Sequence, residues 1–496
     1  MELSPVGVFF VIVYLSIPFV LYIFQRLAEP SDDLLHRRKR TIVLVLGDLA
    51  RSPRMLNHAR SLAQGGLDVD LCGYDEGNKI LPEIANSPRI AIHRIPAIIN
   101  SANLPFVLFA IKKVLLQHIL LLKLLWSLRG ADFLLVQNPP SIPTLGIARF
   151  FVVFLSRPTK LIIDWHNLGY SILALKFSKP KDSFDDAAVS KHPLVWLYRW
   201  YEKFFGYHAY CHFTVSIHMG EVLRNRFKMK AKRILPLYDR PALQFHPLSF
   251  EEKKAVFANH SKDIFDGMGP STQEKIIITS TSYTPDEDIY MLLEALKLYD
   301  TRKSELDSAV IPNGGSSVPK PKKKTLPRLR VIITGKGPLK SEIEEYVENK
   351  LKLSSISIHM PWLAAEDYPL VLGTADVGVS LHLSSSGVDL PMKAVDMFGV
   401  GVPVISVTYP ALSELVRDKV NGLHVKTAQD ITDSFEKLFV DDELYDTVKA
   451  GAMRETRIKW DHEWNKKVGP LFGIGEYRQR NDDEVSESSS SSSSGF

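Results

Sequence analysis

Cysteine is nearly absent from this chain of 496 residues, which contains Cys72 and Cys211 and no third cysteine. Neither lies in a C-x-x-C pattern or in a cluster with histidine. The sequence therefore argues against a disulfide framework and against a structural zinc site. So few thiols fit a protein of a reducing compartment.

A strong charge of one sign is also missing, because 61 basic and 56 acidic residues leave a formal net charge of +5. This modest excess suits an anionic membrane surface or a phosphate-bearing ligand and does not indicate nucleic acid. With 45% hydrophobic and 24% charged residues, the composition is that of a folded protein. The length predicts two domains.

Two phosphate and metal signatures are missing as well. The glycine-containing segment 335–338 lacks the spacing and the Ser or Thr of a P-loop. The acidic residues 286–288 are interpreted as a cluster favoured by a helix start, not as a metal-binding D-x-D motif. We expect no metal ligand and no required cofactor, and leave open whether a divalent cation stimulates activity.

One long hydrophobic run stands out at residues 6–24, which carry no charge and could cross a bilayer as a helix. Basic residues follow at 26 and 36–40, whereas only Glu2 precedes the run, so the body of the protein is predicted in the cytosol. A cleaved signal peptide is the alternative, but its basic start and cleavage site are missing. We expect a membrane anchor in residues 1–30.

The next segment alternates strand and helix. Residues 41–46 (TIVLVL) predict a buried parallel strand, and GDLARSPR at 47–54 leads into a helix that ends near residue 64. Polar segments also follow the predicted strands 132–137 and 160–163, where ligands of open α/β sheets bind. A first domain over residues 31–240 is predicted.

Residues 104–128 are almost wholly apolar except for a few polar side chains that include three lysines. Because a spanning helix with lysines near its middle is unfavourable, the pattern favours an interfacial helix lying on lipid. A buried core helix is the alternative. The helix expected at residues 194–205 is assigned to core packing.

A polar linker at residues 241–274 leads to a second α/β domain at residues 275–475. This domain carries a flexible basic insertion at about 306–325, and a disordered Ser-rich tail follows at 476–496.

The most informative stretch is residues 384–403, SSSGVDLPMKAVDMFGVGVP. A loop that enters a helix offers unpaired backbone N–H groups to a diphosphate, and Lys393 in the first turn adds a positive charge. Asp396, one turn later, could accept hydrogen bonds from ribose hydroxyls. A capped surface helix with both side chains solvated is the alternative interpretation.

The run DMFGVGVPV resembles the E-A-x-A-x-G-x-P-V signature of GT-B nucleotide-sugar glycosyltransferases, with Asp396 in place of the usual Glu. The strings GDLARSPR, DWHNLGYS, ITGKGPL and SSSGVDLPMKAVDMFG are similar to those of chitobiosyldiphosphodolichol β-mannosyltransferases. The resemblance covers nearly the whole chain outside linkers and tail. It implies an α/β GT-B fold, with two Rossmann-like domains facing a cleft after an N-terminal transmembrane helix. In such proteins a final helix, here near residues 461–471, crosses back to the first domain.

The resemblance further implies an inverting mannosyltransferase that moves mannose from GDP-mannose to GlcNAc2-diphosphodolichol in a β-1,4 linkage. It places the enzyme on the cytosolic face of the endoplasmic reticulum membrane, with other mannosyltransferases of the pathway as possible partners. Arg51 and Arg54 stand at a helix start that disfavours cations, so the acceptor diphosphate is expected there. The expected donor-binding residues are Ser282, Lys336, Gly337, Ser386, Gly387, Asp389, Lys393 and Asp396.

An inverting transfer needs a general base for the acceptor hydroxyl. Asp48 is favoured, since inverting GT-B enzymes often carry the base on the loop after the first strand. His166 is the alternative, because its ordinary pKa suits proton transfer near neutrality and relatives use this position to contact the transferred sugar. Asp389 is a third candidate.

Two other functions stay open. The chain could be a non-catalytic membrane-tethered scaffold subunit with a degenerate GT-B fold, but Lys336, Lys393 and Asp396 are present. It could be a retaining GT-B mannosyltransferase acting later on the same lipid. Asp in place of Glu at 396, together with the GDLARSPR and DWHN strings, argues against that.

Overall fold

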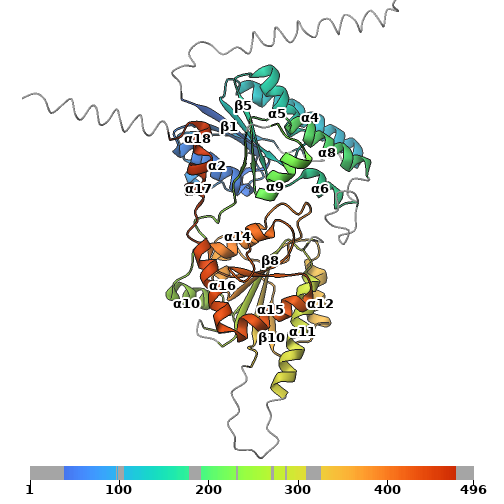
Figure 1. Cartoon of the computed structure of the whole chain (residues 1–496), viewed down its shortest axis with the longest axis vertical. Helices are drawn as coiled ribbons and strands as arrows, with labels where there is room; N and C mark the ends of the chain where they lie inside the picture. Colours follow the sequence, from blue (N-terminus) through green and yellow to red (C-terminus); the bar gives the residue numbers. More distant parts are fainter. Residues whose placement is uncertain are drawn as a thin grey trace, which may run out of the picture.

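The computed structural model describes residues 38–96, 98, 105–177, 192–230, 233–269, 273–284, 287–308 and 325–475. The predicted anchor, most of the basic insertion and the Ser-rich tail lie outside the described residues. Two α/β domains are stacked along the long axis of the molecule (Figure 1). In the part of the chain that the structure describes, no helix is both long and apolar enough for a membrane span.

The first domain contains a seven-stranded sheet with the order β3-β2-β1-β4-β5-β6-β7, in which neighbouring strands are parallel. Its strands are β1 (Arg40–Asp48), β2 (Asp68–Tyr74), β3 (Ile90–Ile95), β4 (Phe133–Asn138), β5 (Lys160–Trp165), β6 (Cys211–Thr214) and β7 (Arg233–Pro236). The order reverses between β1 and β4. At such a switch point, a crevice opens beyond the carboxyl ends of the strands.

Helices cover both faces of this sheet. One face carries α4 (Phe106–Ser127), α5 (Thr144–Phe150), η3 (Phe151–Leu155), α6 (Gly169–Ala174), α8 (Pro193–Gly206), α9 (Ile217–Glu221) and η4 (Val222–Arg226). The other carries η2 (Leu49–Arg51), α2 (Pro53–Gln64), α3 (Pro82–Ala85), α17 (Trp460–Lys467) and α18 (Gly469–Phe472).

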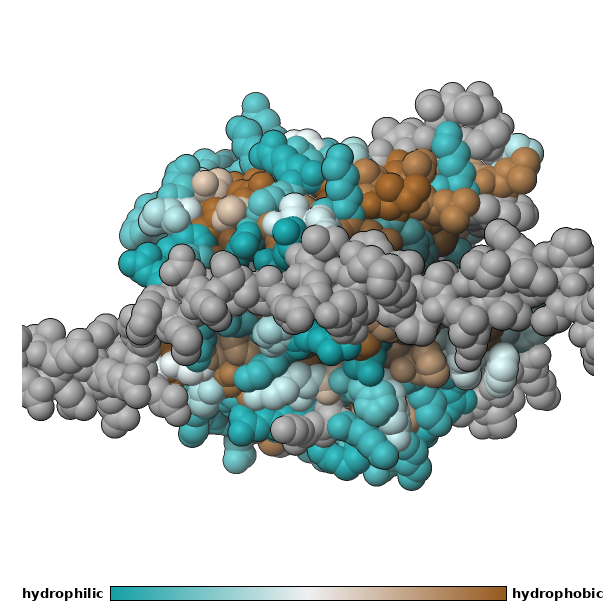
Figure 2. Space-filling view, turned by 90° about the horizontal axis from the view of Figure 1, so that it is seen from above, coloured by the Kyte–Doolittle hydropathy of each residue, from teal (hydrophilic) through white to brown (hydrophobic). Residues whose placement is uncertain are grey.

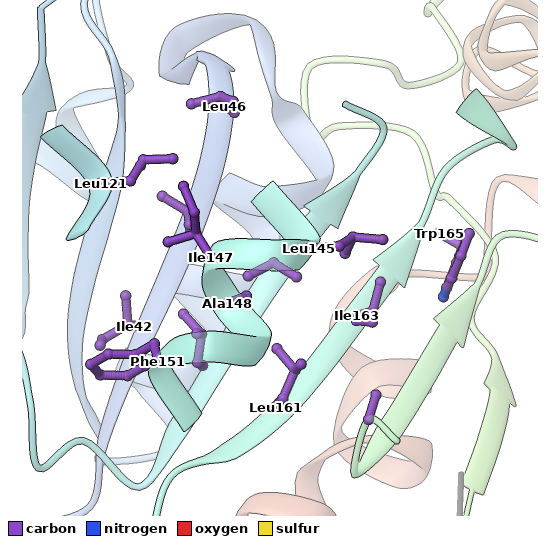
Figure 3. Close-up of a cluster of buried hydrophobic side chains, with 14 of the residues drawn as sticks. Ile42, Leu46, Leu121, Leu145, Ile147, Ala148, Phe151, Leu161, Ile163 and Trp165 are labelled. Atoms are coloured by element: carbon purple, nitrogen blue, oxygen red, sulfur yellow. The ribbon is translucent and has the colours of Figure 1, made fainter. Parts of the chain in front are cut away.

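Strand β1 shows why two cores form. Ile42 and Leu44 point into the core under α4 and α5, whereas Val43 and Val45 point into the core under α2. All four are fully buried, as expected of a parallel strand covered on both faces. Figure 3 shows the first core, where Ile42 lies beside Phe151.

Helix α4 is buried on one side and exposed on the other, so it is not a wholly buried core helix. Leu121 and Leu125 are fully buried against the sheet, whereas Leu115 and Ile119 on the outer side are exposed. The assignment of α8 to core packing is wrong for most of its surface. Within α8 only Val195, Glu202 and Gly206 are buried, because the helix meets its neighbours through a narrow side and leaves a wide aromatic side uncovered.

The second domain contains a six-stranded parallel sheet with the order β10-β9-β8-β11-β12-β13. Its strands are β8 (Lys275–Thr281), β9 (Leu329–Gly335), β10 (Ile356–His359), β11 (Val377–Ser380), β12 (Val404–Val407) and β13 (Gly422–Val425). The order again reverses next to its first strand, between β8 and β11, which repeats the arrangement of the first domain.

Two helix layers also enclose this sheet. One contains α11 (Ile289–Ser308), α12 (Lys340–Asn349) and α15 (Ala428–Val440), and the other contains α10 (Phe250–Asn259), α13 (Asp367–Leu372), α14 (Met392–Gly399) and η5 (Leu412–Glu414). Helix α16 (Asp442–Glu455) contributes Val448 to the first core and Ala452 to the second.

The expected linker at 241–274 is largely part of the second domain. Phe245, Phe257 and Phe265 are buried in its core, and Ser249 and Glu252 form a capping box at the start of α10. The hydrophobic spacing was too weak to reveal this helix, because few of its side chains are buried.

The expected crossing of the final helix is confirmed, and it corrects the end of the second domain. Helices α17 and α18 lie beside α2 of the first domain (Figure 1), and Trp464 is buried in that domain's core. Its indole N–H donates to His58 Nδ1 over 2.9 Å. Residues 460–474 therefore belong to the first domain by packing.

Replacing Trp464 tests this attachment. We expect Trp464→Ala to destabilise the first domain by about 3–5 kcal/mol, because it removes a fully buried indole. The matched control is Trp362→Ala, since this indole is 56% exposed and its loss should cost within about 1 kcal/mol. Urea unfolding followed by circular dichroism gives both values, and equal midpoints for the two variants would contradict the assignment.

Candidate functional site

A cavity of about 430 Å³ lies between the two domains. The end of β4 and the segments after β1, β5, β6 and β7 contribute its wall on one side, and the segments after β8 and β11 contribute the other. All lie at or beyond the carboxyl ends of strands. Six expected site residues line it: Arg51, Arg54, His166, Ser282, Asp389 and Lys393. Five polar residues that were not expected as site residues also line it: Ser52, Gln137, Asp239, Glu287 and His382.

Asp164, at the end of β5, organises the first-domain wall. Its carboxylate is fully buried and accepts 2.8 Å hydrogen bonds from Arg54 Nε and Nη2. His166 Nε2 lies 3.0 Å from Asp164 Oδ2. Burial alone would raise the pKa of Asp164, but Arg54 and the histidines outweigh it and hold this pKa well below its ordinary value. The carboxylate therefore stays ionised and orients His166.

The same carboxylate reaches the crossing helix through His58. Because the Trp464 indole donates to His58 Nδ1, neutral His58 carries its proton on Nε2, which lies 3.2 Å from Asp164 Oδ2. Burial lowers the pKa of His58, so the neutral form is favoured. Helix α17 thus supports the wall of the cavity.

The two arginines expected to contact the acceptor diphosphate differ. Arg54 is 4% exposed, and its guanidinium also donates to Leu237 O and Asp239 Oδ1. With these partners it neutralises and orients carboxylates, which revises its expected role. The Arg51 side chain is 73% exposed and lies 3.6 Å from Asp48, so it is available to a ligand anion.

Asp48 is not among the described residues that line the cavity. Its carboxylate accepts from the Ala50 backbone N–H over 3.2 Å and from Asn78 Nδ2 over 2.6 Å. Asp48 therefore caps the short helix η2, and both of its oxygens have partners in the loop.

On the second-domain wall, Lys393 in the first turn of α14 forms an ion pair with Glu287. Glu287 also accepts from Thr281 Oγ1 and from the Ser282 backbone N–H, both over 2.7 Å. Glu287 precedes α11, as the interpretation of residues 286–288 expected, but it is also 7% exposed and fixes Lys393, which that interpretation did not include. The two residues are 106 positions apart, so local sequence carried no signal of their contact.

Asp389 is a second fixed carboxylate on this wall. His382 Nε2 lies 3.0 Å from Asp389 Oδ2, and Ser384 Oγ also donates to Asp389. Burial opposes both charges, yet the pair outweighs it: the pKa of Asp389 is lowered and the pKa of His382 is raised. The wall therefore presents an acid–histidine pair in which each partner stabilises the charged form of the other.

Two expected donor residues lie in the loop before α14, where that loop meets the first domain. Ser386 Oγ donates to Asn167 Oδ1 over 2.8 Å, which joins the loop before α14 to the loop after β5. Gly387 has a φ of +71°, a left-handed conformation that glycine adopts without strain. Asn167 and Ser171 also lie near Ser385.

Besides Ser386 and Gly387, three further expected donor residues lie outside the described cavity lining: Lys336, Gly337 and Asp396. Lys336 Nζ lies 4.0 Å from the ring centre of Trp362. A Cβ atom at Gly337 would come within 1.7 Å of the Ser282 carbonyl oxygen, so glycine lets the two loops touch. Asp396 lies 3.5 Å from the Tyr368 hydroxyl, and burial raises the pKa of Asp396 to about 7.

Comparisons with known proteins agree with this architecture. A family model described as "Glycosyl transferases group 1" matches residues 316–441. Among solved structures, sucrose-phosphate synthase from Thermosynechococcus elongatus has a TM-score of 0.59 at 14% identity, covering 90% of this chain and 100% of that one. The glycosyltransferase WaaG has a TM-score of 0.55 at 9% identity, covering 87% and 99%. Together with the two facing parallel sheets, these matches confirm the GT-B fold.

Proteins of similar sequence define the family more narrowly than the solved structures do. A chitobiosyldiphosphodolichol beta-mannosyltransferase of Yarrowia lipolytica is 52% identical over 485 residues, which cover 97% of this chain and 97% of that protein. The protein of the same name from Mus musculus is 34% identical and covers 90% and 91%. Over nearly its whole length, the chain belongs to the chitobiosyldiphosphodolichol beta-mannosyltransferase family of glycosyltransferases.

Proposed function

We propose that the chain transfers mannose from GDP-mannose to chitobiose linked to dolichol diphosphate, with inversion to a β-1,4 linkage. The observation that carries the proposal is the cavity in which Lys393 of one domain faces His166 and Arg51 of the other. Such a cleft can hold a nucleotide sugar on one wall and an acceptor on the other. The family relationship argues against the retaining alternative.

The donor diphosphate would bind at the start of α14, where backbone N–H groups and Lys393 supply positive charge. Glu287 holds the ammonium group in place before the donor binds, so little reorganisation is needed. Ser282 and Asp389 lie on the same wall. Asp396, Lys336 and Gly337 would serve parts of the nucleotide farther from the reacting carbon.

His166 is the better-placed base. With its Nε2 proton donated to Asp164, neutral His166 has Nδ1 as its acceptor nitrogen. It would take the proton of the acceptor hydroxyl while the hydroxyl oxygen bonds to the mannose anomeric carbon. The bond from that carbon to GDP breaks, and Lys393 stabilises the departing diphosphate. Asp48 stays the alternative, although its oxygens are occupied by Ala50 and Asn78.

The first test supplies the full chain in detergent with GDP-mannose and a short-chain diphosphate-linked chitobiose. We expect a mannosylated product that β-mannosidase cleaves and α-mannosidase does not. Lys393→Ala should lower kcat by roughly 100-fold, since one electrostatic stabiliser typically contributes about 3 kcal/mol to the transition state. The control is Lys352→Ala, on an exposed part of the second domain. An α-linked product, or normal turnover of Lys393→Ala, would contradict the proposal.

A second test separates the two candidate bases. His166→Ala should lower kcat by about 100-fold or more while GDP binding, measured by calorimetry, stays unchanged, because a base acts only on the acceptor. Asp48→Asn should keep most of its turnover. An active His166→Ala variant beside an inert Asp48→Asn variant would return the role to the aspartate.

We also propose that the catalytic body faces the cytosol on the endoplasmic reticulum membrane, held by a single anchor in residues 1–30. The basic residues at 36–40 follow the hydrophobic run, as on the cytosolic side of many anchors. A pool of cytosolic nucleotide sugar would then reach the cavity directly.

A glycosylation sequon reports this orientation. Asn259 begins the sequence N-H-S and is exposed at the end of α10. We expect Asn259 to stay unmodified in cells, as judged by an unchanged mass after glycosidase treatment. A control in which a cleavable signal peptide replaces residues 1–30 should gain a glycan that Asn259→Gln removes. A glycan at Asn259 on the native chain would overturn the orientation.

A further inference from the structure

The helix layer formed by α4, α5, α6 and α8 exposes an unusual amount of apolar surface. On α8, Trp196 and Phe204 are each 59% exposed, and Trp200 is 45% exposed. Leu115 and Ile119 are exposed on α4. Seen from above, the first domain gathers hydrophobic residues on the side where Figure 1 shows α4 and α8 (Figure 2). Large exposed apolar patches mark contact surfaces, so this face needs an occupant.

Apart from one buried glutamate, the charged side chains of this helix layer are basic. Within the described α4, α5, α6 and α8, the only acidic residue is Glu202. It is fully buried, where it accepts from Ser141 Oγ and the Gly169 backbone N–H. The same helices carry six basic residues: Lys112, Lys113, Lys123, Arg149, Arg199 and Lys203. An outward surface of aromatic and basic side chains without an acidic one matches an anionic bilayer.

A cavity in this face further supports its fit to a lipid bilayer. A cavity of about 540 Å³ is lined by Arg149, Trp200, Lys203, Phe204, Tyr207 and His208. Stacked Trp200 and Phe204 rings, with centroids 5.1 Å apart, stand beside the two cations. Such a hollow can take the phosphate of a lipid headgroup against the cations and the start of an acyl chain against the rings.

We propose that this face, defined by Leu115, Ile119, Trp196, Trp200 and Phe204, docks on an anionic lipid bilayer. The docking is a second membrane contact, separate from the predicted anchor. This inference depends on the proposed function, in which the acceptor is linked to a lipid. The docking would hold the first domain beside the membrane in which that acceptor lies. Helix α6 connects the face to the catalytic wall, since it begins at Gly169, three residues after His166.

Cysteine labelling tests the contact on the full chain in vesicles. Both native cysteines are buried, so a fluorophore attached to Phe204→Cys reports that position. In vesicles containing phosphatidylserine, we expect quenching by bromine-labelled lipid and at least about threefold protection from aqueous iodide. The matched control Trp362→Cys, at an exposed site on the second domain, should show the opposite pattern. Adding Lys203→Glu to the label variant should weaken the lipid quenching.

The outcomes separate the possible occupants. A Phe204→Cys label that iodide quenches as strongly as the control overturns the proposal. Protection from both quenchers also overturns it, and would indicate contact with a second copy of the chain.

Turnover distinguishes docking from catalysis. The double variant Trp200→Glu with Phe204→Glu should lose at least about tenfold activity on a dolichol-length acceptor in vesicles. It should keep normal activity on a short-chain acceptor in detergent. If the proposed function itself is wrong, the unmodified chain will not transfer mannose to the short-chain acceptor in detergent. Equal use of the long acceptor by both proteins would contradict the docking.

Discussion

The buried ion pair between Asp164 and Arg54 is the interaction on which the catalytic wall depends. Both side chains are nearly inaccessible to water, and removing one partner from such a pair typically costs about 3–5 kcal/mol, because the other charge is left uncompensated. Asp164 ends β5, Arg54 begins α2, and Leu237 and Asp239 follow β7. One charge pair therefore fixes three segments of the first domain relative to one another. It also explains Arg54 at a helix start that would otherwise disfavour positive charge.

The second domain also fixes its site residues by pairing acidic with basic side chains. Glu287 fixes Lys393, and His382 fixes Asp389, in each case across a loop at the carboxyl end of the sheet. The two walls are then joined by neutral contacts, such as that of Ser386 with Asn167, and by Glu414, which accepts from the backbone N–H groups of residues 217 and 218. Glu414 also pairs with the His218 imidazole and accepts from the Tyr238 hydroxyl, so one carboxylate holds the loops of the first domain against the second. The charge pairs within each wall keep each half of the site preorganised for two bulky substrates.

The sequence predicted most strands well, because a strand buried on both faces reads as a continuous apolar run. The predicted strand at 41–46 lies within β1, and His166 and Lys393, both predicted as site residues, line the cavity. Contacts between distant residues could not be predicted. Arg54 meets Asp164 across 110 positions, and nothing near Glu287 in the sequence indicates Lys393. Periodicity likewise revealed α8 as a helix but not which of its sides faces water.

Exposed apolar residues are distributed unevenly over the two domains. Helix α11 of the second domain mixes both signs of charge, with Glu294, Glu305 and Asp307 beside Lys297, Arg302 and Lys303. The first domain instead leaves Trp196 and its neighbours uncovered, although burying them would have stabilised the fold. Retaining such a face is understandable if an anionic bilayer covers it. The crossing helix α17 joins the chain end of the second domain to the first through Trp460 and Trp464, so the two halves of the site stay together whichever surface the first domain contacts.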